Sequence, residues 1–150
     1  SEAAPLAAER RVVALVPGVD VTLAEPELPA RGAARLAQVA PFALEEQLAG
    51  DVEDFHFAVG RQDAAGRARV AAVPRARMRG WLDALAAAGL SPEAMYCDTL
   101  CLPENPGKTV AALEAGQLTV QPPDALPFAL SVEPLTEAFA LAGLEGDDRH

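Results

Sequence analysis

The chain has 150 residues, of which 51% are apolar, and a formal net charge of −10 at pH 7. This length suits one domain or two small lobes, and the apolar fraction is that of a folded chain rather than a disordered one. The acidic balance argues against a nucleic-acid or anionic-membrane surface, because phosphate binding needs clustered Lys and Arg. Half of the basic residues do cluster, as Arg61, Arg67, Arg69, Arg75, Arg77 and Arg79. Such a strip is either a solvated face, which we favour, or a surface that docks a partner.

Targeting and redox signals indicate a cytoplasmic chain. No stretch approaches the roughly 20 apolar residues that cross a bilayer. The first residues, SEAAPLAAERR, lack the basic start and the apolar centre of a signal peptide. Two cysteines, Cys97 and Cys101, make no disulfide framework, so we expect reduced thiols.

The first half of the chain alternates between strand and helix periods. Residues 11–18 predict a buried strand that ends at Pro17 and Gly18, and residues 19–24 a half-buried strand, so we expect an antiparallel hairpin. Residues 31–49 have the helical period, with Pro41 either kinking one helix or starting a second one. Gly50 is a natural stop. The helical stripe consists of Leu36, Val39, Ala40, Ala43, Leu44 and Leu48.

The second half continues this mixed pattern. Residues 54–74 predict a second hairpin, with Phe55, Phe57 and Val59 on one face of its first strand and His56 on the other. A helix is expected from about Pro74 to Ala88. Residues 92–103 predict a strand, residues 108–116 and 117–121 two short strands, and residues 126–144 a loop followed by a helix of about ten residues. The fold class is therefore α/β, as a mixed α+β domain.

Two short motifs suggest sites, but neither fits the chemistry. NPGKT, residues 105–109, resembles the end of a phosphate-binding loop, yet Leu102 stands where that loop requires a glycine, so a Pro-Gly turn is predicted. Cys97 and Cys101 would lie about 13 Å apart on one strand, too far to share a metal. We interpret them as two semi-buried packing residues.

Glu45, Glu46 and His56 are the remaining candidates for acid–base chemistry. Consecutive helical residues point about 100° apart, so the two glutamates do not form a close carboxylate pair. His56 is predicted to be a packed, hydrogen-bonded side chain. The three serines, Ser1, Ser91 and Ser131, give no support for a Ser-His-Asp arrangement. We therefore predict no catalytic, cofactor-binding or metal-binding residues, and no enzyme.

Several separated motifs together resemble one family. LVPG at 15–18, LEEQLAGDVEDFHFAVG at 44–60, WLDALAAAGL at 81–90 and PEAMYCDTLCLP at 92–103 occur with the order and spacing of GspL. GspL is the inner-membrane platform protein of the bacterial type II secretion system. The resemblance covers about residues 11–104.

The resemblance implies a fold and a role. It implies an actin-like, ribonuclease-H-like α/β lobe and a non-enzymatic scaffold that recruits the secretion ATPase GspE, through its N-terminal domain, to the cytoplasmic face of the inner membrane. In the family, a membrane helix and a periplasmic domain connect to GspM. The contact residues for GspE are unknown, and no cofactor is implied.

The chain departs from the family pattern at both ends. The first strands of the actin-like lobe would precede residue 11 and the membrane helix would follow residue 150, so we expect an excised cytoplasmic piece without membrane contact of its own. We expect a flexible lead at 1–10, the actin-like portion at 11–104, a continuation or second small lobe at 105–144, and a disordered tail at 145–150. An exposed strand edge would favour a homodimer.

Two other functions stay open. One is an actin-like nucleotide-binding ATPase or kinase relative, which needs a second phosphate loop with an Asp-Gly pair. Gly146-Asp147 has the reverse order. The other is a homo-oligomerising structural module, whose own dimer is its function.

Overall fold

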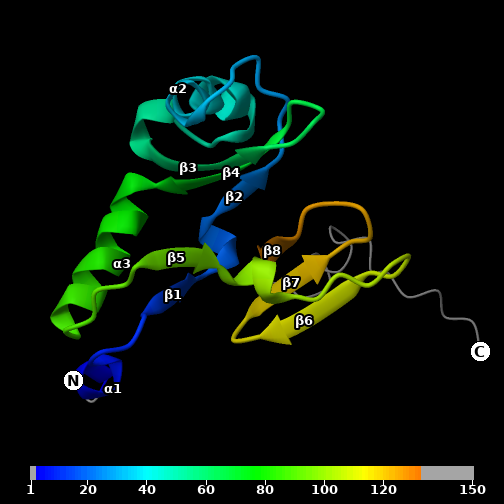
Figure 1. Ribbon diagram of the computed structural model, residues 1–150. Helices are drawn as coiled ribbons and strands as arrows, with labels where there is room; N and C mark the ends of the chain where they lie inside the picture. Colours follow the sequence, from blue (N-terminus) through cyan, green and yellow to red (C-terminus); the bar gives the residue numbers. More distant parts are fainter. Residues whose placement is uncertain (1–2, 133–150) are drawn as a thin grey trace, which may run out of the picture. The chain divides into compact units, whose positions relative to one another are not determined.

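The computed structural model describes residues 3–132. They form two compact units, which are considered separately below (Figure 1). Among the described residues, the first unit contains residues 3–16 and 20–97, and the second contains residues 17–19 and 98–132. A short helix α1 (Ala3–Ala7) lies at the start of the first unit.

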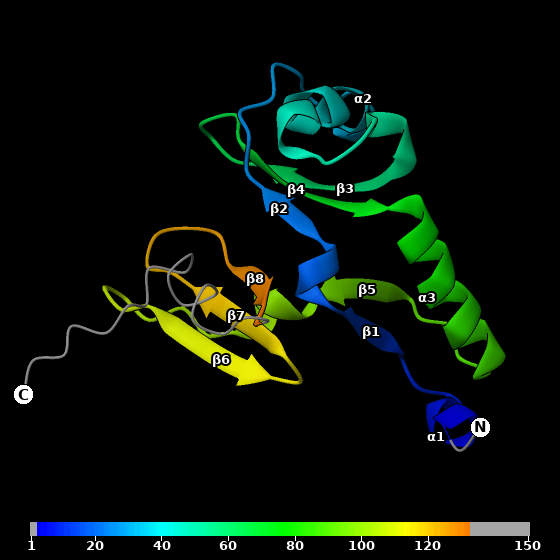
Figure 2. The same cartoon turned by 180° about the vertical axis from the view of Figure 1, so that it is seen from behind.

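The core of the first unit is a three-stranded antiparallel sheet with a helix on one face. The strand order is β2 (Thr22–Ala24), β4 (Ala68–Pro74), β3 (Phe55–Gln62). The helix α2 (Ala33–Leu44) covers one face of this sheet, as Figures 1 and 2 show from opposite sides. Pairing of β3 with β4 confirms the predicted hairpin.

Helix α2 forms because its apolar residues recur at the helical spacing. Leu36, Ala40 and Leu44 are buried on one stripe and pack against Phe55 and Val70 of the sheet. The chain passes through Pro41 as one helix, which settles the alternative that the sequence left open. Two 3₁₀ turns, η2 (Glu45–Gln47) and η3 (Val52–Asp54), then lead into β3.

The predicted first hairpin is wrong. Strand β1 (Val13–Val16) pairs in parallel with β5 (Ala94–Cys97), whereas β2 pairs with β4. The Pro-Gly segment makes a 3₁₀ turn, η1 (Gly18–Asp20), that separates the two strands instead of joining them as a hairpin. The strand is also not buried as predicted, because Val13 and Leu15 are 44% and 59% exposed.

Helix α3 (Arg75–Ala87) confirms the helix that the sequence predicts before β5. Its half-buried residues follow one stripe, which consists of Met78, Trp81 and Leu85. Gly89 ends the helix with φ 72°, and the amide of Leu90 donates to the carbonyl of Leu85.

The second unit is built on an antiparallel meander. Strands β6 (Val110–Glu114), β7 (Gln117–Gln121) and β8 (Phe128–Ser131) pair in that order, and Leu118 and Val120 form the buried centre. The first two strands were predicted, but β8 replaces the start of the predicted loop. The helix predicted beyond it lies outside the described residues.

Candidate functional site

The acid–base candidates do not come together as a reactive cluster. Glu45 and Glu46 are exposed on η2, and His56 is exposed on β3. The prediction of a packed His56 is wrong, because its side of the sheet lies away from α2 and borders an open groove. Within residues 3–132, no group of three or more His, Cys, Asp or Glu side chains is arranged to hold a metal ion.

Neither NPGKT nor the segment of the two cysteines has the local structure of a ligand site: the first is a turn, and the second runs from the end of a strand into a 3₁₀ helix. The amide of Lys108 donates to the carbonyl of Asn105 at 3.0 Å, and Gly107 has φ 71°, so NPGKT is the predicted Pro-Gly turn. The predicted strand 92–103 ends at Cys97, and a 3₁₀ helix η4 (Asp98–Cys101) follows it. The strand spacing assumed for the cysteines is therefore wrong: Cys97 is buried, Cys101 is exposed, and neither forms a disulfide.

In the second unit, the side chain of Asp98 binds the backbone amide that follows Pro17. Its carboxylate accepts a hydrogen bond from the amide of Gly18 at 2.8 Å, and the Nε2 of Gln117 lies 3.3 Å from its other oxygen. Gly18 itself is buried. A phosphate at the Gly18 amide would meet a carboxylate instead of an unoccupied amide.

The residues of the β3–β4 turn line a second open groove, but their polar side chains form hydrogen bonds that hold the turn and its neighbouring backbone. Asp63 accepts hydrogen bonds from the amides of Arg67 at 2.8 Å and Ala65 at 2.9 Å. The hydrogen bond from the Arg67 amide is the main cause that lowers the pKa of the Asp63 carboxyl below its ordinary value. Gln62 donates to the carbonyls of Leu28 and Gly66, at 2.9 and 2.8 Å.

The arginines between 61 and 79 do not form one uniform patch. Arg67 pairs with Asp63 and Arg77 with Asp20, at 3.6 and 3.2 Å, and Arg75 donates to the carbonyl of Glu53. Arg61 and Arg69 are exposed at a β-bulge, where the register shifts between Val59 and Gln62.

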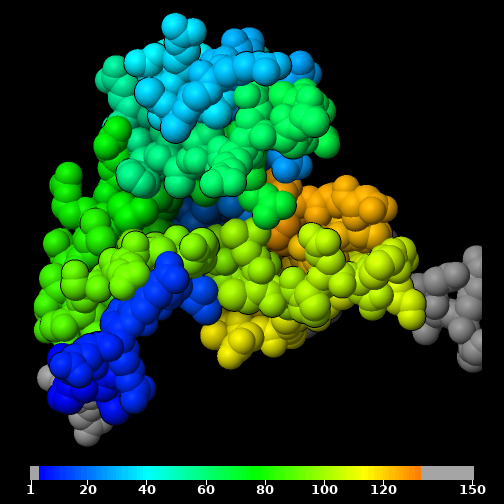
Figure 3. All heavy atoms as spheres, in the orientation of Figure 1, coloured from blue at the N-terminus to red at the C-terminus, as the bar shows by residue number. Residues whose placement is uncertain are grey.

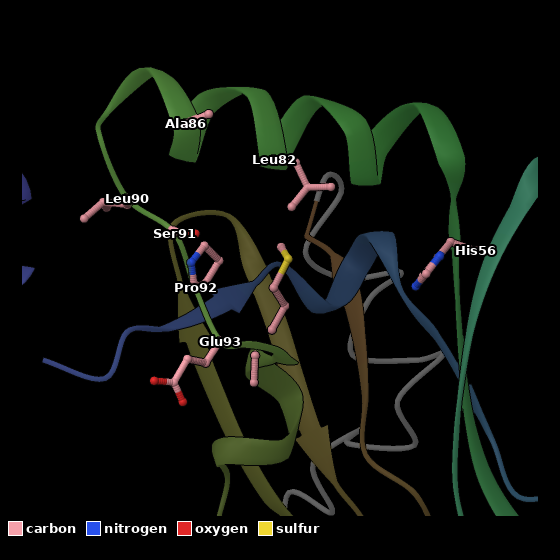
Figure 4. A pocket seen from close by; sticks show the side chains of 9 residues that line it. His56, Leu82, Ala86, Leu90, Ser91, Pro92 and Glu93 are labelled. Atoms are coloured by element: carbon pink, nitrogen blue, oxygen red, sulfur yellow. The ribbon is translucent and has the colours of Figure 1, made fainter.

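An open groove of about 480 Å³ in the first unit is the feature best suited to hold another molecule. It is lined by Leu82 and Ala86 of α3, by residues 90–93, by Ala94 and Met95 of β5, and by His56 of β3. The space-filling view shows the surface of this unit hollowed beside α3 and β5 (Figure 3). In Figure 4, Leu82 points from α3 into this space and His56 points toward it from the other side. The groove offers apolar contact and strand backbone, which suit a protein partner rather than chemistry on a small molecule.

These features define a mixed α/β domain with an open groove, and the comparisons give its family. The type II secretion system protein L family matches residues 2–130, so the chain belongs to the GspL family, a structural component of that system and not an enzyme.

Sequence relatives agree with this assignment. The type II secretion system protein L of Pseudomonas aeruginosa is 46% identical over 83 residues, which cover 55% of this chain and 22% of that protein. The protein L of Vibrio cholerae is 36% identical over 111 residues, 72% of this chain and 26% of that protein. The chain thus spans about a quarter of the length of these relatives.

Solved structures confirm the fold class. The cytoplasmic domain of EpsL, an inner membrane component of the type II secretion system of Vibrio cholerae, superimposes with a TM-score of 0.75 at 27% identity, covering 99% of this chain and 62% of that one. The PilM-PilN type IV pilus biogenesis complex matches with a TM-score of 0.60 at 22% identity, covering 89% and 47%. The second likeness shows the mixed α/β, actin-like fold alone.

Proposed function

We propose that this chain is a scaffold that recruits the secretion ATPase GspE, through its N-terminal domain, and anchors it at the inner membrane. The observation that carries the proposal is the family match over residues 2–130. The open groove beside α3 and β5 supports it, because it gives the domain a surface on which a protein segment can lie. The similar PilM was solved together with a second protein, PilN, which supports a docking role for this fold.

The same proposal places the chain on the cytoplasmic face of the inner membrane. The structure that it resembles along 99% of its length is a cytoplasmic domain of an inner membrane component. No helix within residues 3–132 is both long and apolar enough to cross a bilayer. GspM and other platform proteins would bind regions of the longer relatives that this chain does not match.

Isothermal titration calorimetry with the purified N-terminal domain of GspE tests the scaffold. We expect a one-to-one complex at low salt that weakens as salt rises, because the exposed arginines contribute screened charge pairs. The double variant Arg75→Glu and Arg79→Glu should weaken it more than Arg31→Glu with Arg35→Glu, which makes the same change in net charge elsewhere. If neither heat nor a complex is detected at low salt, this chain does not hold the ATPase.

Two observations bear on the other functions. The carboxylate of Asp98 on the amide of Gly18 disfavours nucleotide binding, and micromolar retention of labelled ATP in equilibrium dialysis would revive that function. The exposed apolar residues of β1, a strand of a two-stranded parallel sheet, favour self-association, because parallel sheets are normally buried. A molecular mass from solution scattering that stays monomeric at every concentration would contradict self-association.

A further inference from the structure

Strand β5 has a backbone edge that no other described strand covers. Among residues 3–132, β5 pairs with β1 alone, in a two-stranded parallel sheet. The groove is lined by Ala94 and Met95 of β5 but by no residue of β1. It therefore lies on the side of β5 that faces away from β1, beside backbone groups that a further strand could pair with.

Helix α3 forms an apolar wall along this edge. Leu82 and Ala86 lie one turn apart on the same stripe, and Leu82 is 46% exposed although it is large and apolar. Leu82 and Ala86 border the half-buried stripe of Met78, Trp81 and Leu85, so the apolar face of α3 continues onto a side that its own unit leaves open. A volume of about 480 Å³ falls within the range of clefts that bind ligands.

The charges at the rim of the groove favour an acidic occupant. Arg75 and Arg79 precede Leu82 and Ala86 on the same helical stripe, within a sector about 60° wide, and both are exposed. Asp83 flanks the stripe on one side only. The acidic lining residue, Glu93, pairs with Arg11 at 2.9 Å, which offsets its charge. The Nε of Arg75 donates to the carbonyl of Glu53, so carboxylates of an occupant would meet Arg79 and the remaining N–H groups of Arg75 at this end of α3.

We propose that the groove binds an extended, acidic and apolar segment of a partner protein, which adds as a strand to the outer edge of β5. The apolar side chains of that segment lie on Leu82 and Ala86, and its carboxylates face Arg75 and Arg79. Strand addition supplies affinity through backbone hydrogen bonds, while the alternating side chains supply selectivity. This inference rests on the proposed scaffold function and gives it a binding site.

Nuclear magnetic resonance of the ¹⁵N-labelled chain tests the site with a defined probe. The probe is an octapeptide of alternating Val and Glu with blocked ends, and its control carries Lys in place of each Glu. We expect the probe to shift and protect the amides of Met95 and Tyr96, and the Lys control to bind at least about fivefold more weakly. No shift at about 1 mM probe, or equal binding of the Lys control, overturns the proposal.

Two alanines near the end of α3 provide a matched pair of variants. Ala86 lines the groove, whereas Ala87 is exposed elsewhere on the helix. Ala86→Arg should weaken probe binding at least about tenfold, and Ala87→Arg should change it less than about twofold. Equal effects of the two substitutions overturn the proposal. So does protection of the β5 amides that rises with protein concentration without probe, because a second copy would then occupy the edge.

The same variants separate this inference from the scaffold function. Calorimetry with the N-terminal domain of GspE is run on the unmodified chain and on Ala86→Arg. If the domain binds neither protein while the probe binds the unmodified chain, the scaffold function fails and the groove remains a peptide site. If the domain binds both proteins equally, the scaffold function stands and the groove is not its site, which overturns the inference.

Discussion

Replacing Gly18 by alanine tests how tightly the second unit is packed. A Cβ built on Gly18 would overlap the Cγ2 of Thr99, and it would lie 2.9 Å from the Oδ1 of Asp98 and 3.1 Å from the Cβ of Ala129. Thr99 is 1% exposed and has no space to move into. The backbone at Gly18 is not left-handed, so the cost comes from these three neighbours and not from its conformation.

The magnitude follows from two effects. Forcing an extra methyl group into a packed site costs about 1–3 kcal/mol. Moving the carboxylate of Asp98 also weakens its 2.8 Å hydrogen bond with the Gly18 amide, and a hydrogen bond to a charged group contributes about 1.5–3 kcal/mol. A single displacement of the neighbouring side chains can relieve part of the crowding and part of the hydrogen-bond loss together. We therefore expect Gly18→Ala to lower the free energy of unfolding by about 2–4 kcal/mol. This corresponds to a melting temperature lower by about 5–12 °C.

Urea unfolding followed by circular dichroism measures this loss, and Gly80→Ala is its control. Gly80 lies within α3 with no atom within 4 Å of a built Cβ, so the same substitution there should stabilise the helix by about 0.5–1 kcal/mol. Hydrogen exchange of the β7 amides locates the Gly18→Ala loss in the second unit. A stability within about 0.5 kcal/mol of the unmodified chain would refute the packing argument.

Three further predictions concern the first unit. Leu44→Ala should lower the free energy of unfolding by about 2–5 kcal/mol, measured by urea titration, because Leu44, the last residue of α2, is fully buried against the sheet. Gln62→Ala should cost about 1–2 kcal/mol by the same assay, since two backbone carbonyls lose a donor. The pKa of the Asp63 carboxyl, followed by its ¹³C resonance, should lie below its ordinary value. Arg67→Asn should leave this pKa lowered, because the backbone amide of residue 67 is the main cause and is kept in the variant. The stabilisation from Asp63 is thus present above the ordinary carboxyl pKa and lost as pH falls through the lowered one.

Local patterns predicted the elements whose partners are close in sequence. The hairpin of β3 and β4, helix α3, and strands β6 and β7 follow from the alternation or the helical stripe of their own residues. The burial of Leu36, Ala40 and Leu44 follows in the same way, because one stripe of α2 must face the sheet.

Long-range pairing was not predictable from these patterns. Val13 pairs with Ala94, and the whole β2–β4–β3 sheet and its helix lie between them in sequence. A short apolar run indicates that residues 13–16 form a strand, but it carries no information about the partner. For the same reason the exposure of His56 was missed, since it depends on where α3 and β5 lie beside the sheet.

The end of β5 shows how one side chain sets local structure. Residues 98–101 lie within the strand predicted at 92–103, yet they form η4. The carboxylate of Asp98, the first residue of η4, accepts a hydrogen bond from the amide of Gly18, a contact that lies 80 residues away in sequence. Such a contact between residues 18 and 98 leaves no trace in either local pattern.

The hydrogen-bonded amide of Gly18 and the unpaired backbone edge of β5 together support one interpretation of this domain. The Gly18 amide is already bonded to a carboxylate, which a phosphate there would meet. The backbone edge of β5, in contrast, borders a groove walled by exposed apolar residues of α3. This distribution favours a protein strand over an anionic ligand as the occupant, because backbone pairing needs an unpaired edge rather than a reactive side chain. The scaffold function that we propose would require only the open edge, and not a site for a small molecule.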